Sequence, residues 1–371
     1  MKKVVQFISS LHMGGAEIIV KDYVSLLNKD IIDSRVLLMQ SFDCVNEEEV
    51  RKQGIPIDSL IKTKASKFII KKLINFTRRH IEFIKYFKKE KIDVLHIHLP
   101  IVSYVFFHKK LFKNVKLYHT VHADLKYMFK KNTQRKFEKY CVKRLIKSHN
   151  LQLIALHDDM RIQLNEMFNV NNTLVLNNGI NLERFKKELY VDSREDILKD
   201  IGFNEDDFIV GHVGRLNIAK NHKFLIEVFV ELLNYKSNAK LLLVGAGELK
   251  QEIMELLDYY HIIDKVVILG NRTDVPDLMS VMNVFLFPSS YEGLGIAVIE
   301  AQSLGLRCVV SKAVPEAAHV TEQYVSLSLD ENKSIWCKAL LGNNICSIPK
   351  MSIEDYDMRK IVYKLANLYL I

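Results

Sequence analysis

Short, almost continuous apolar runs alternate along the chain with longer segments whose apolar residues recur at helical spacing. Apolar runs of this kind, separated by helices, are typical of parallel strands covered by helices on both faces of a sheet. In the first half of the chain the runs are residues 4–9, 35–39, 93–98, 115–122, 151–157 and 173–179. We expect each run to be a strand of one parallel sheet.

The same rhythm starts again after Gly202. The second series of runs covers residues 208–214, 239–245, 265–270, 284–289 and 307–311. Two such series predict an α/β protein with two doubly wound, Rossmann-like domains. Ligands of such domains bind at the carboxyl ends of the strands.

The segment Asn177–Phe185 separates the two series and predicts a hinge. We therefore expect a first domain over residues 1–185 and a second over residues 186–349. A late amphipathic helix over residues 350–371 follows the second sheet, and we expect it to pack back toward the first domain.

Composition narrows the class of protein. The chain has 371 residues, of which 49% are hydrophobic and 26% are charged, as in globular proteins. No apolar run approaches the roughly 18 residues that span a bilayer, and we interpret Val4–Ile8 as a first strand and not as a signal peptide. The five cysteines have neither a metal spacing nor a pairing pattern, which favours reduced thiols in a cytosol.

Positive charge is concentrated in the first half of the chain. Residues 1–185 hold 33 lysines and arginines against 18 acidic residues, while the rest holds 20 against 26, which gives a net charge of +9. This asymmetry indicates that the first domain faces an anionic partner.

Much of this charge lies in the segment Lys67–Lys91, which predicts an amphipathic helix. We expect an apolar stripe on one side and a basic face on the other. The predicted stripe is Ile70, Leu73, Ile74, Ile81 and Ile84, and the predicted basic face is Lys71, Arg78, Lys85 and Lys89. An ordinary domain helix accounts for the stripe, whereas the basic face suits an anionic membrane surface.

Two glutamates, Glu292 and Glu300, lie eight positions apart after a predicted strand, in the stretch FPSSYEGLGIAVIEAQSLG. With Gly293 and Gly295 in the turn, we expect Glu300 about two turns into a helix, ~12 Å from Glu292. Carboxylates at that spacing, with the N–H groups of Leu294 and Gly295, suit the hydroxyl groups of a nucleotide sugar. Alternatively, Glu300 pairs with a core cation and Glu292 caps the helix.

Further candidates follow other strands. Gly14 and Gly15 lie between a strand and a helix and permit close approach of an anion, although a plain turn fits equally well. Arg215 and Lys220 suit a pyrophosphate, although solvated loop cations are the commoner case. A glycine turn, Gly245–Lys250, fits either a nucleotide contact or a turn alone.

Four histidines end two strands: His96 and His98 in one, His119 and His122 in the next. Such histidines are more often hydrogen-bonded structural residues than catalytic ones. Zinc is disfavoured because no spaced cysteine or carboxylate accompanies them.

Together these motifs resemble the family-4 retaining glycosyltransferases of the GT-B type, and in particular the bacterial capsule and exopolysaccharide enzymes. The resemblance covers nearly the whole chain. It rests on the E-x7-E element Glu292–Glu300, on VGRL with Lys220, and on the motifs GGAE, HIH and TVH. It implies the GT-B fold, in which the two Rossmann-like domains face each other across a cleft. It also implies that the first domain takes the acceptor and that the second binds the nucleotide sugar.

The resemblance also implies a role for each matching residue. Glu300 would bind the ribose, and Glu292, Gly293, Leu294 and Gly295 would surround the donor sugar. Arg215 and Lys220 would grip the diphosphate, over which the turn at Gly14 and Gly15 would close. The remaining matches are His122 near the sugar, His98 on the acceptor side, and Arg272 at the base. Lys312, where many relatives have an acid, leaves the identities of donor and acceptor open.

The implied reaction moves a sugar from a nucleoside diphosphate, expected to be UDP, to a hydroxyl of a glycan or lipid-linked saccharide, with retention. We expect cell-surface polysaccharide biosynthesis at the inner, cytoplasmic face of the membrane, with no metal, cofactor or nucleic acid; the sequence leaves the oligomeric state open. Two alternatives stay open, namely a nucleotide-sugar epimerase of the same fold and a non-catalytic anion- or membrane-binding protein.

Overall fold

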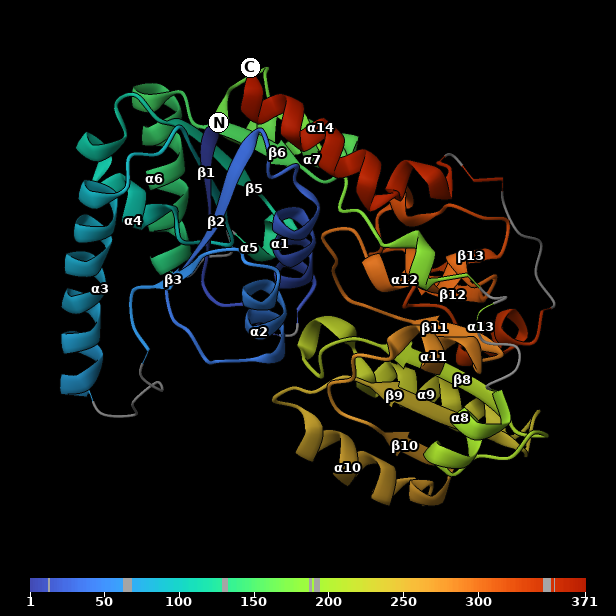
Figure 1. Cartoon of the computed structure of the whole chain (residues 1–371). Helices are drawn as coiled ribbons and strands as arrows, with labels where there is room; N and C mark the ends of the chain where they lie inside the picture. Colours follow the sequence, from blue (N-terminus) through green and yellow to red (C-terminus); the bar gives the residue numbers. More distant parts are fainter. Residues whose placement is uncertain are drawn as a thin grey trace. The chain divides into compact units, whose positions relative to one another are not determined.

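The computed structural model describes residues 1–12, 14–62, 69–128, 133–186, 189, 194–342, 348–349 and 351–371. The chain forms two compact units (Figure 1). The first unit comprises Met1–Gly179 and Met358–Ile371, and the second comprises Ile180–Asp357. The boundaries between the units along the chain therefore fall at residues 179/180 and 357/358, whereas the sequence predicted boundaries at 185/186 and 349/350.

The first unit is built on a seven-stranded sheet whose paired strands are all parallel, in the order β3-β2-β1-β4-β5-β6-β7. Its strands are β1 Lys2–Ile8, β2 Ile32–Leu38, β3 Ile57–Ser59, β4 Val94–His98, β5 Lys116–Thr120, β6 Gln152–Ala155 and β7 Leu174–Val175. This confirms the predicted parallel sheet. The short edge strand β3 was not predicted.

Helices connect these strands and cover the sheet. They are α1 Gly15–Leu26, α2 Val45–Lys52, α3 Ile69–Lys89, α4 Val102–Phe107, α5 Leu125–Met128, α6 Thr133–His149 and α7 Asp158–Phe168. The last helix of the chain, α14 Met358–Leu370, also belongs to this unit and contacts β1 and α1. Ile361, Leu365 and Tyr369 of α14 are fully buried, so apolar burial fastens the end of the chain to the first sheet.

The second unit has a six-stranded parallel sheet in the order β10-β9-β8-β11-β12-β13. Its strands are β8 Phe208–Val213, β9 Ala239–Val244, β10 Val266–Ile268, β11 Val284–Phe287, β12 Arg307–Ser311 and β13 Tyr324–Leu327. Its helices are α8 Arg194–Ile201, α9 His222–Leu233, α10 Lys250–Tyr259, α11 Val275–Ser280, α12 Ile296–Ser303 and α13 Lys333–Leu340.

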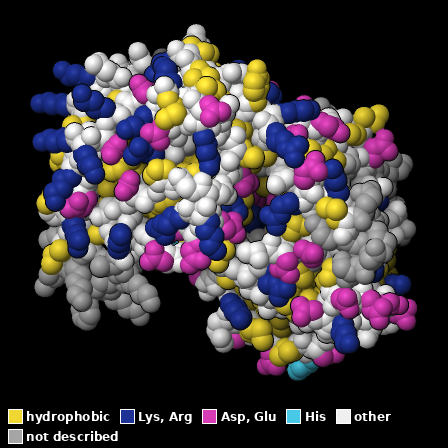
Figure 2. Space-filling view, viewed as in Figure 1, with side chains coloured by type: hydrophobic (Ala, Val, Ile, Leu, Met, Phe, Trp, Pro, Cys, Tyr) yellow, Lys and Arg dark blue, Asp and Glu magenta, His cyan; other side chains and the backbone are white. Residues whose placement is uncertain are grey.

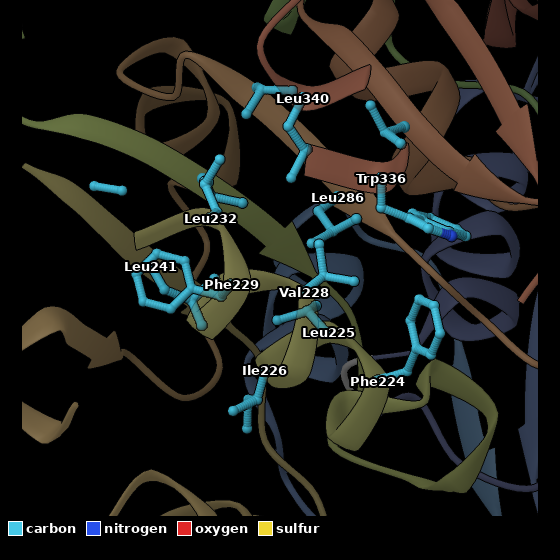
Figure 3. Close-up of a cluster of buried hydrophobic side chains, with 14 of the residues drawn as sticks. Phe224, Leu225, Ile226, Val228, Phe229, Leu232, Leu241, Leu286, Trp336 and Leu340 are labelled. Atoms are coloured by element: carbon cyan, nitrogen blue, oxygen red, sulfur yellow. The ribbon is translucent and has the colours of Figure 1, made fainter. Parts of the chain in front are cut away.

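The core of the second unit lies between this sheet and helices α9 and α13 (Figure 3). The apolar sequence of α9 buries most of that helix, including Leu225 and Phe229, which are fully buried. Trp336 of α13 packs edge-on against Phe224 of α9, with ring centroids 5.1 Å apart. The core thus positions the β8–α9 connection, which carries two of the predicted site residues.

Helix α3 forms within the predicted range, but two residues of the predicted apolar stripe, Ile74 and Ile81, are exposed, while Ile84 is half-buried. Among the described apolar side chains of α3, Phe83 and Phe87 are buried against the unit, and Phe83 packs on Phe7 of β1 with ring centroids 5.4 Å apart. Ile74 and Ile81 are instead 58% and 47% exposed. Large aromatic side chains bury more apolar area than isoleucine, which favours the burial of Phe83 and Phe87, although Phe76 of the same helix is 49% exposed. The side chains of Ile70, Leu73 and Lys71 lie outside the described residues.

This orientation of α3 predicts opposite outcomes for two neighbouring substitutions. We expect Phe83→Ala to lower the free energy of unfolding by about 3–5 kcal/mol, because it removes a fully buried aromatic ring. Ile81→Ala should stay within about 0.5 kcal/mol of the parent, because the side chain is half exposed. Urea denaturation of both variants is the measurement. If Ile81→Ala lowered the free energy of unfolding more than Phe83→Ala does, this orientation of the helix would be contradicted.

Candidate functional site

Three loops at the carboxyl ends of β8, β9 and β11 carry most of the predicted site residues of the second unit. The backbone N–H of Leu216 donates to the carbonyl of Ala246 over 3.1 Å, and the N–H of Leu249 donates to the carbonyl of Leu216 over 3.0 Å. The N–H of Ser290 donates to the carbonyl of Ala219 over 2.7 Å. The β8 loop is therefore bonded to both of its neighbours, as the convergence of parallel strands at one sheet edge allows.

Two glycines permit the close approach of the β8 and β9 loops. Gly245 has a φ of +141°, and a Cβ atom on it would lie 2.1 Å from the carbonyl oxygen of Gly214. A Cβ atom on Gly247 would lie 2.2 Å from the carbonyl oxygen of Leu216. Either distance is far below a van der Waals contact. The predicted glycine turn thus has a structural role, which is to hold the loop that carries Arg215.

Lys220 and Glu292 form an ion pair across the β8 and β11 loops. The Lys220 Nζ lies 2.5 Å from Glu292 Oε1, and the two side chains are only 17% and 11% exposed. The same ammonium group lies 4.5 Å from the ring centroid of Phe287, at the end of β11. A largely buried lysine requires such partners, because an unpaired charge at this depth would be costly. The structure therefore brings together a cation and a carboxylate that the sequence assigned to one site.

The two arginines of the predicted site have carboxylate partners. Arg215 lies 3.3 Å from Glu248 of the β9 loop, and both side chains are more than half exposed. Arg272 forms a close pair with Asp274 at 2.5 Å and lies 3.7 Å from Asp200. Hydrogen bonding to Arg272 lowers the pKa of the Asp274 carboxyl. Arg215 is the more accessible cation, whereas Arg272 is held by Asp274 of its own loop and lies near Asp200 of α8.

The turn before α12 differs from the prediction in one respect. Helix α12 begins at Ile296, with Gly295 as its N-cap residue in the left-handed conformation at φ +88°. Glu300 therefore lies about one turn into the helix and not two, so the expected ~12 Å rise does not apply. Gly293, Leu294 and Gly295 are buried, and Glu292 and Glu300 are half-buried. Tight burial of the turn fixes the direction in which its N–H groups point.

A second group of predicted residues lies in the first unit. Gly14 is the N-cap residue of α1 and Gly15 its first residue, so the glycines do lie at a helix N-terminus after β1. His98 ends β4, and its Nδ1 lies 2.9 Å from Nε2 of His122, which follows β5. Burial lowers the pKa of His122 to about 3 and that of His98 well below its ordinary value. Both imidazoles are therefore neutral at physiological pH.

Sequence reasoning missed two residues next to these histidines. Gln6 of β1 donates to the hydroxyl oxygen of Tyr369 of α14 over 2.9 Å, and its own amide oxygen lies 2.9 Å from Nε2 of His98. Gln6 interrupts an apolar strand, which is a signal that could have been used. Tyr369 gives no such signal, because it occupies an ordinary apolar position of an amphipathic helix. Within the described residues, no group of three or more His, Cys, Asp and Glu is placed to hold a metal ion.

Two family models match successive parts of the chain. Glycosyltransferase Family 4 matches residues 13–184, and Glycosyl transferases group 1 matches residues 193–335. The chain belongs to the family-4 glycosyltransferases. This enzyme is 28% identical to the UDP-Gal:alpha-D-GlcNAc-diphosphoundecaprenol alpha-1,3-galactosyltransferase of Escherichia coli, over 74% of each chain. It is 24% identical to the capsular polysaccharide biosynthesis glycosyltransferase CapH of Staphylococcus aureus, over 89% of this chain and 86% of that one.

Solved structures share the fold of this chain. The Anabaena protein HepE in complex with UDP-glucose matches this glycosyltransferase with a TM-score of 0.78 at 17% identity, over 99% of both chains. The lipopolysaccharide glycosyltransferase WaaG matches with a TM-score of 0.76 at 15% identity. At these identities the likeness shows the fold, and it confirms the predicted GT-B class.

The loop contact at Gly245 predicts the effect of adding a single methyl group. We expect Gly245→Ala to lower the free energy of unfolding of the enzyme by clearly more than Gly202→Ala does. Gly202 also has a positive φ, +75°, but its Cβ would meet nothing within 4 Å, so strain alone applies there, about 1–2 kcal/mol. Urea denaturation of the two variants measures the difference. Equal losses would show that the β8 loop does not need this approach.

Proposed function

We propose that this enzyme transfers a sugar, with retention, from a UDP-sugar to a hydroxyl of a glycan or lipid-linked saccharide in cell-surface polysaccharide biosynthesis. The observation that carries the proposal is the buried Lys220–Glu292 pair beside the accessible Arg215, on loops bonded to one another. Support comes from the Escherichia coli relative, whose name gives a UDP-galactose donor and a diphosphoundecaprenol-linked acceptor, and from HepE, which was solved with UDP-glucose.

The chemistry of the pair suits such a donor. In the free protein Lys220 and Glu292 neutralise each other. A bound diphosphate supplies Lys220 with new negative charge, and the sugar hydroxyls supply Glu292 with hydrogen-bond donors, so both exchange partners without leaving an unpaired charge. Charge develops on the departing diphosphate in the transition state, where Arg215 and Lys220 stabilise it. The acceptor proton passes to the donor phosphate on the same face of the sugar, so no metal or cofactor is required.

The other predicted residues receive roles that fit their positions. Glu300 binds the ribose hydroxyls, and the N–H groups of Leu294 and Gly295 bind sugar oxygens. Arg272 contacts the base from the loop after β10. In the first unit, Gly14 and Gly15 offer the N-terminus of α1 to the phosphates. His122 lies by the sugar, and His98 lies on the acceptor side. The relatives reported above are named as transferases, which lends no support to an epimerase or a non-catalytic protein.

Loss of the accessible cation tests the donor grip. We expect Arg215→Ala to lower turnover by about 10²–10³, the cost of removing one preorganised donor to developing charge. The measurement is release of UDP from a UDP-sugar in the presence of a lipid-linked acceptor. Lys338→Ala, an exposed change on α13, serves as the control and should leave turnover unchanged. Near-normal turnover of a folded Arg215→Ala would contradict the assignment, and an absence of UDP release by the parent would contradict glycosyl transfer itself.

The first unit carries a surface suited to the membrane on which a lipid-linked acceptor would lie. Arg78, Lys85, Lys88 and Lys89 of α3 are exposed, and Figure 2 shows Lys and Arg side chains gathered at that edge of the unit. At 3.6 residues per turn, Ile74 and Ile81 fall in the same sector of α3 as Arg78 and Lys85. The exposed face is therefore both basic and apolar, where the sequence predicted a purely basic face. Within the described residues, no helix is long and apolar enough to cross a bilayer.

We therefore propose that the enzyme binds peripherally to the cytoplasmic leaflet through α3, and a fourfold substitution tests this. Arg78, Lys85, Lys88 and Lys89 changed to Gln should reduce co-sedimentation with anionic vesicles, since each basic residue near such a surface contributes about 1 kcal/mol. The control changes four exposed lysines of the second unit, Lys199, Lys223, Lys250 and Lys338, to Gln. Binding should also fall in about 0.5 M salt. Equal losses in both variants, or binding that ignores salt, would contradict a specific role for α3.

A further inference from the structure

A row of buried polar side chains crosses the sheet of the first unit. Gln6 of β1, His96 and His98 of β4 and Thr120 of β5 are each at most 1% exposed. Strand register pairs Gln6 with His96 and His98 with Thr120, and the period-two alternation of strands places all four on one face. Tyr369 of α14, which packs against β1, reaches the same row. Buried polar groups persist in a core only when hydrogen bonds satisfy them.

These side chains form one unbroken chain of hydrogen bonds. The Tyr369 hydroxyl oxygen lies 2.9 Å from Nε2 of Gln6 and 2.6 Å from Nδ1 of His96, whose Nε2 lies 2.7 Å from the Thr120 hydroxyl. On the other side of Gln6, its Oε1 lies 2.9 Å from Nε2 of His98. His98 Nδ1 in turn lies 2.9 Å from Nε2 of His122. This hydrogen-bonded chain of side chains thus runs from Thr120 to His122, with Gln6 in the middle.

The amide of Gln6 gives the chain its direction. Its Nε2 donates to the phenol oxygen of Tyr369, whose proton then goes to Nδ1 of His96. Its Oε1 accepts from Nε2–H of His98, so the neutral His98 has a bare Nδ1 that must accept from Nε2–H of His122. Neutral His122 is left with a bare Nδ1. Turning the amide over would reverse every bond and place a proton on that Nδ1.

The bare Nδ1 of His122 is buried and has no hydrogen-bond partner among the described residues. Burial also keeps this ring neutral, with a pKa of about 3, so the nitrogen stays an acceptor and does not become a donor. Nearby His119 donates through Nδ1 to the carbonyl of Ile97, and burial lowers its pKa to about 4, so it brings no competing positive charge. An unpartnered buried acceptor costs free energy that a bound hydroxyl would recover.

We propose that Gln6 and Tyr369 are positioning residues, which hold His122 as the Nε2–H tautomer so that its Nδ1 accepts a hydrogen bond from a saccharide hydroxyl. The inference rests on the proposed function for the identity of the ligand, but the tautomer itself does not. It gives the last turn of α14 a part in the site of the first unit. The hydroxyl belongs either to the donor sugar or to the acceptor, and the ligand series below distinguishes the two.

The tautomer can be read in the free, full-length protein. Long-range ¹H–¹⁵N spectra of histidine-labelled protein should show His122 protonated at Nε2 alone, with assignment by a His122→Gln spectrum. Addition of UDP should leave the Nδ1 resonance in place. A shift on adding UDP-glucose or UDP-galactose assigns the hydroxyl to the donor sugar, and a shift only with a lipid-linked acceptor assigns it to the acceptor. A proton on Nδ1 in the free protein, or no shift with any saccharide, would overturn the proposal.

A matched pair of tyrosines separates positioning from packing. Tyr369→Phe removes the hydroxyl that orients Gln6, so we expect a mixture of His122 tautomers and a roughly tenfold loss in kcat/KM, with UDP affinity within about twofold of the parent. Tyr118→Phe is the control, because the Tyr118 hydroxyl donates to the Leu368 carbonyl of α14 over 2.7 Å yet lies outside the chain. In the Tyr118→Phe variant, the His122 tautomer and the kcat/KM should match those of the parent.

Equal effects of the two tyrosine variants would show that the hydrogen bonds from Thr120 to His122 contribute only packing, and this would overturn the proposal. Gln6→Glu provides a second readout, because a carboxylate accepts from both His98 and Tyr369. It should keep His122 in the Nε2–H tautomer while releasing His96 from its bond to the Tyr369 proton. Failure of the parent to release UDP would count against the proposed function alone, since the free-protein tautomer is measured without any turnover.

Discussion

Backbone hydrogen bonds between the loops after β8, β9 and β11 set the shape on which the second unit's site depends. They form because parallel strands end at one edge of the sheet and because Gly245 and Gly247 leave room for the neighbouring carbonyls. Lys220 and Glu292 are 72 positions apart in the chain, yet these bonds hold their loops side by side. A side-chain ion pair could not set this geometry alone, because two long side chains lose rotamer freedom when they pair. The Lys220–Glu292 ion pair therefore forms in a geometry that the backbone hydrogen bonds have already set.

The strands were predictable from sequence to the extent that they are buried on both faces. Every run that was predicted as a strand contains one, whereas β3 and β13 were missed because Ile57–Ser59 and Tyr324–Leu327 are short and mix apolar with polar residues. For α3 the sequence indicated a helix but not its orientation. Ile74 and Ile81 fit a helical period as well as Phe83 and Phe87 do, and only the shape of the neighbouring surface decides which set is buried.

The candidate site shows the same division between local pattern and long-range contact. Glu292, Glu300, Arg215 and Lys220 are found by motif, but their geometry is not, since the expected helical spacing assumed that the helix began before Ile296. The partners Gln6 and Tyr369 are separated by 363 positions, and no local pattern relates them. What sequence could have offered is a polar residue in a strand that should be wholly apolar. Such a residue requires a partner, even when its identity stays hidden.

The two units meet the cost of buried polarity in different ways. In the second unit Lys220 and Glu292 form an ion pair and neutralise each other, so the diphosphate donor that we propose would bind by exchange of partners. In the first unit burial keeps His98 and His122 uncharged. Each neutral imidazole must donate a hydrogen bond at one nitrogen and accept one at the other, so the direction of the hydrogen bonds decides what these rings can bind. Binding of a hydroxyl at a neutral acceptor depends on hydrogen-bond geometry and only weakly on ionic strength. Salt should therefore weaken the hold on a diphosphate far more than the hold on a sugar hydroxyl at His122.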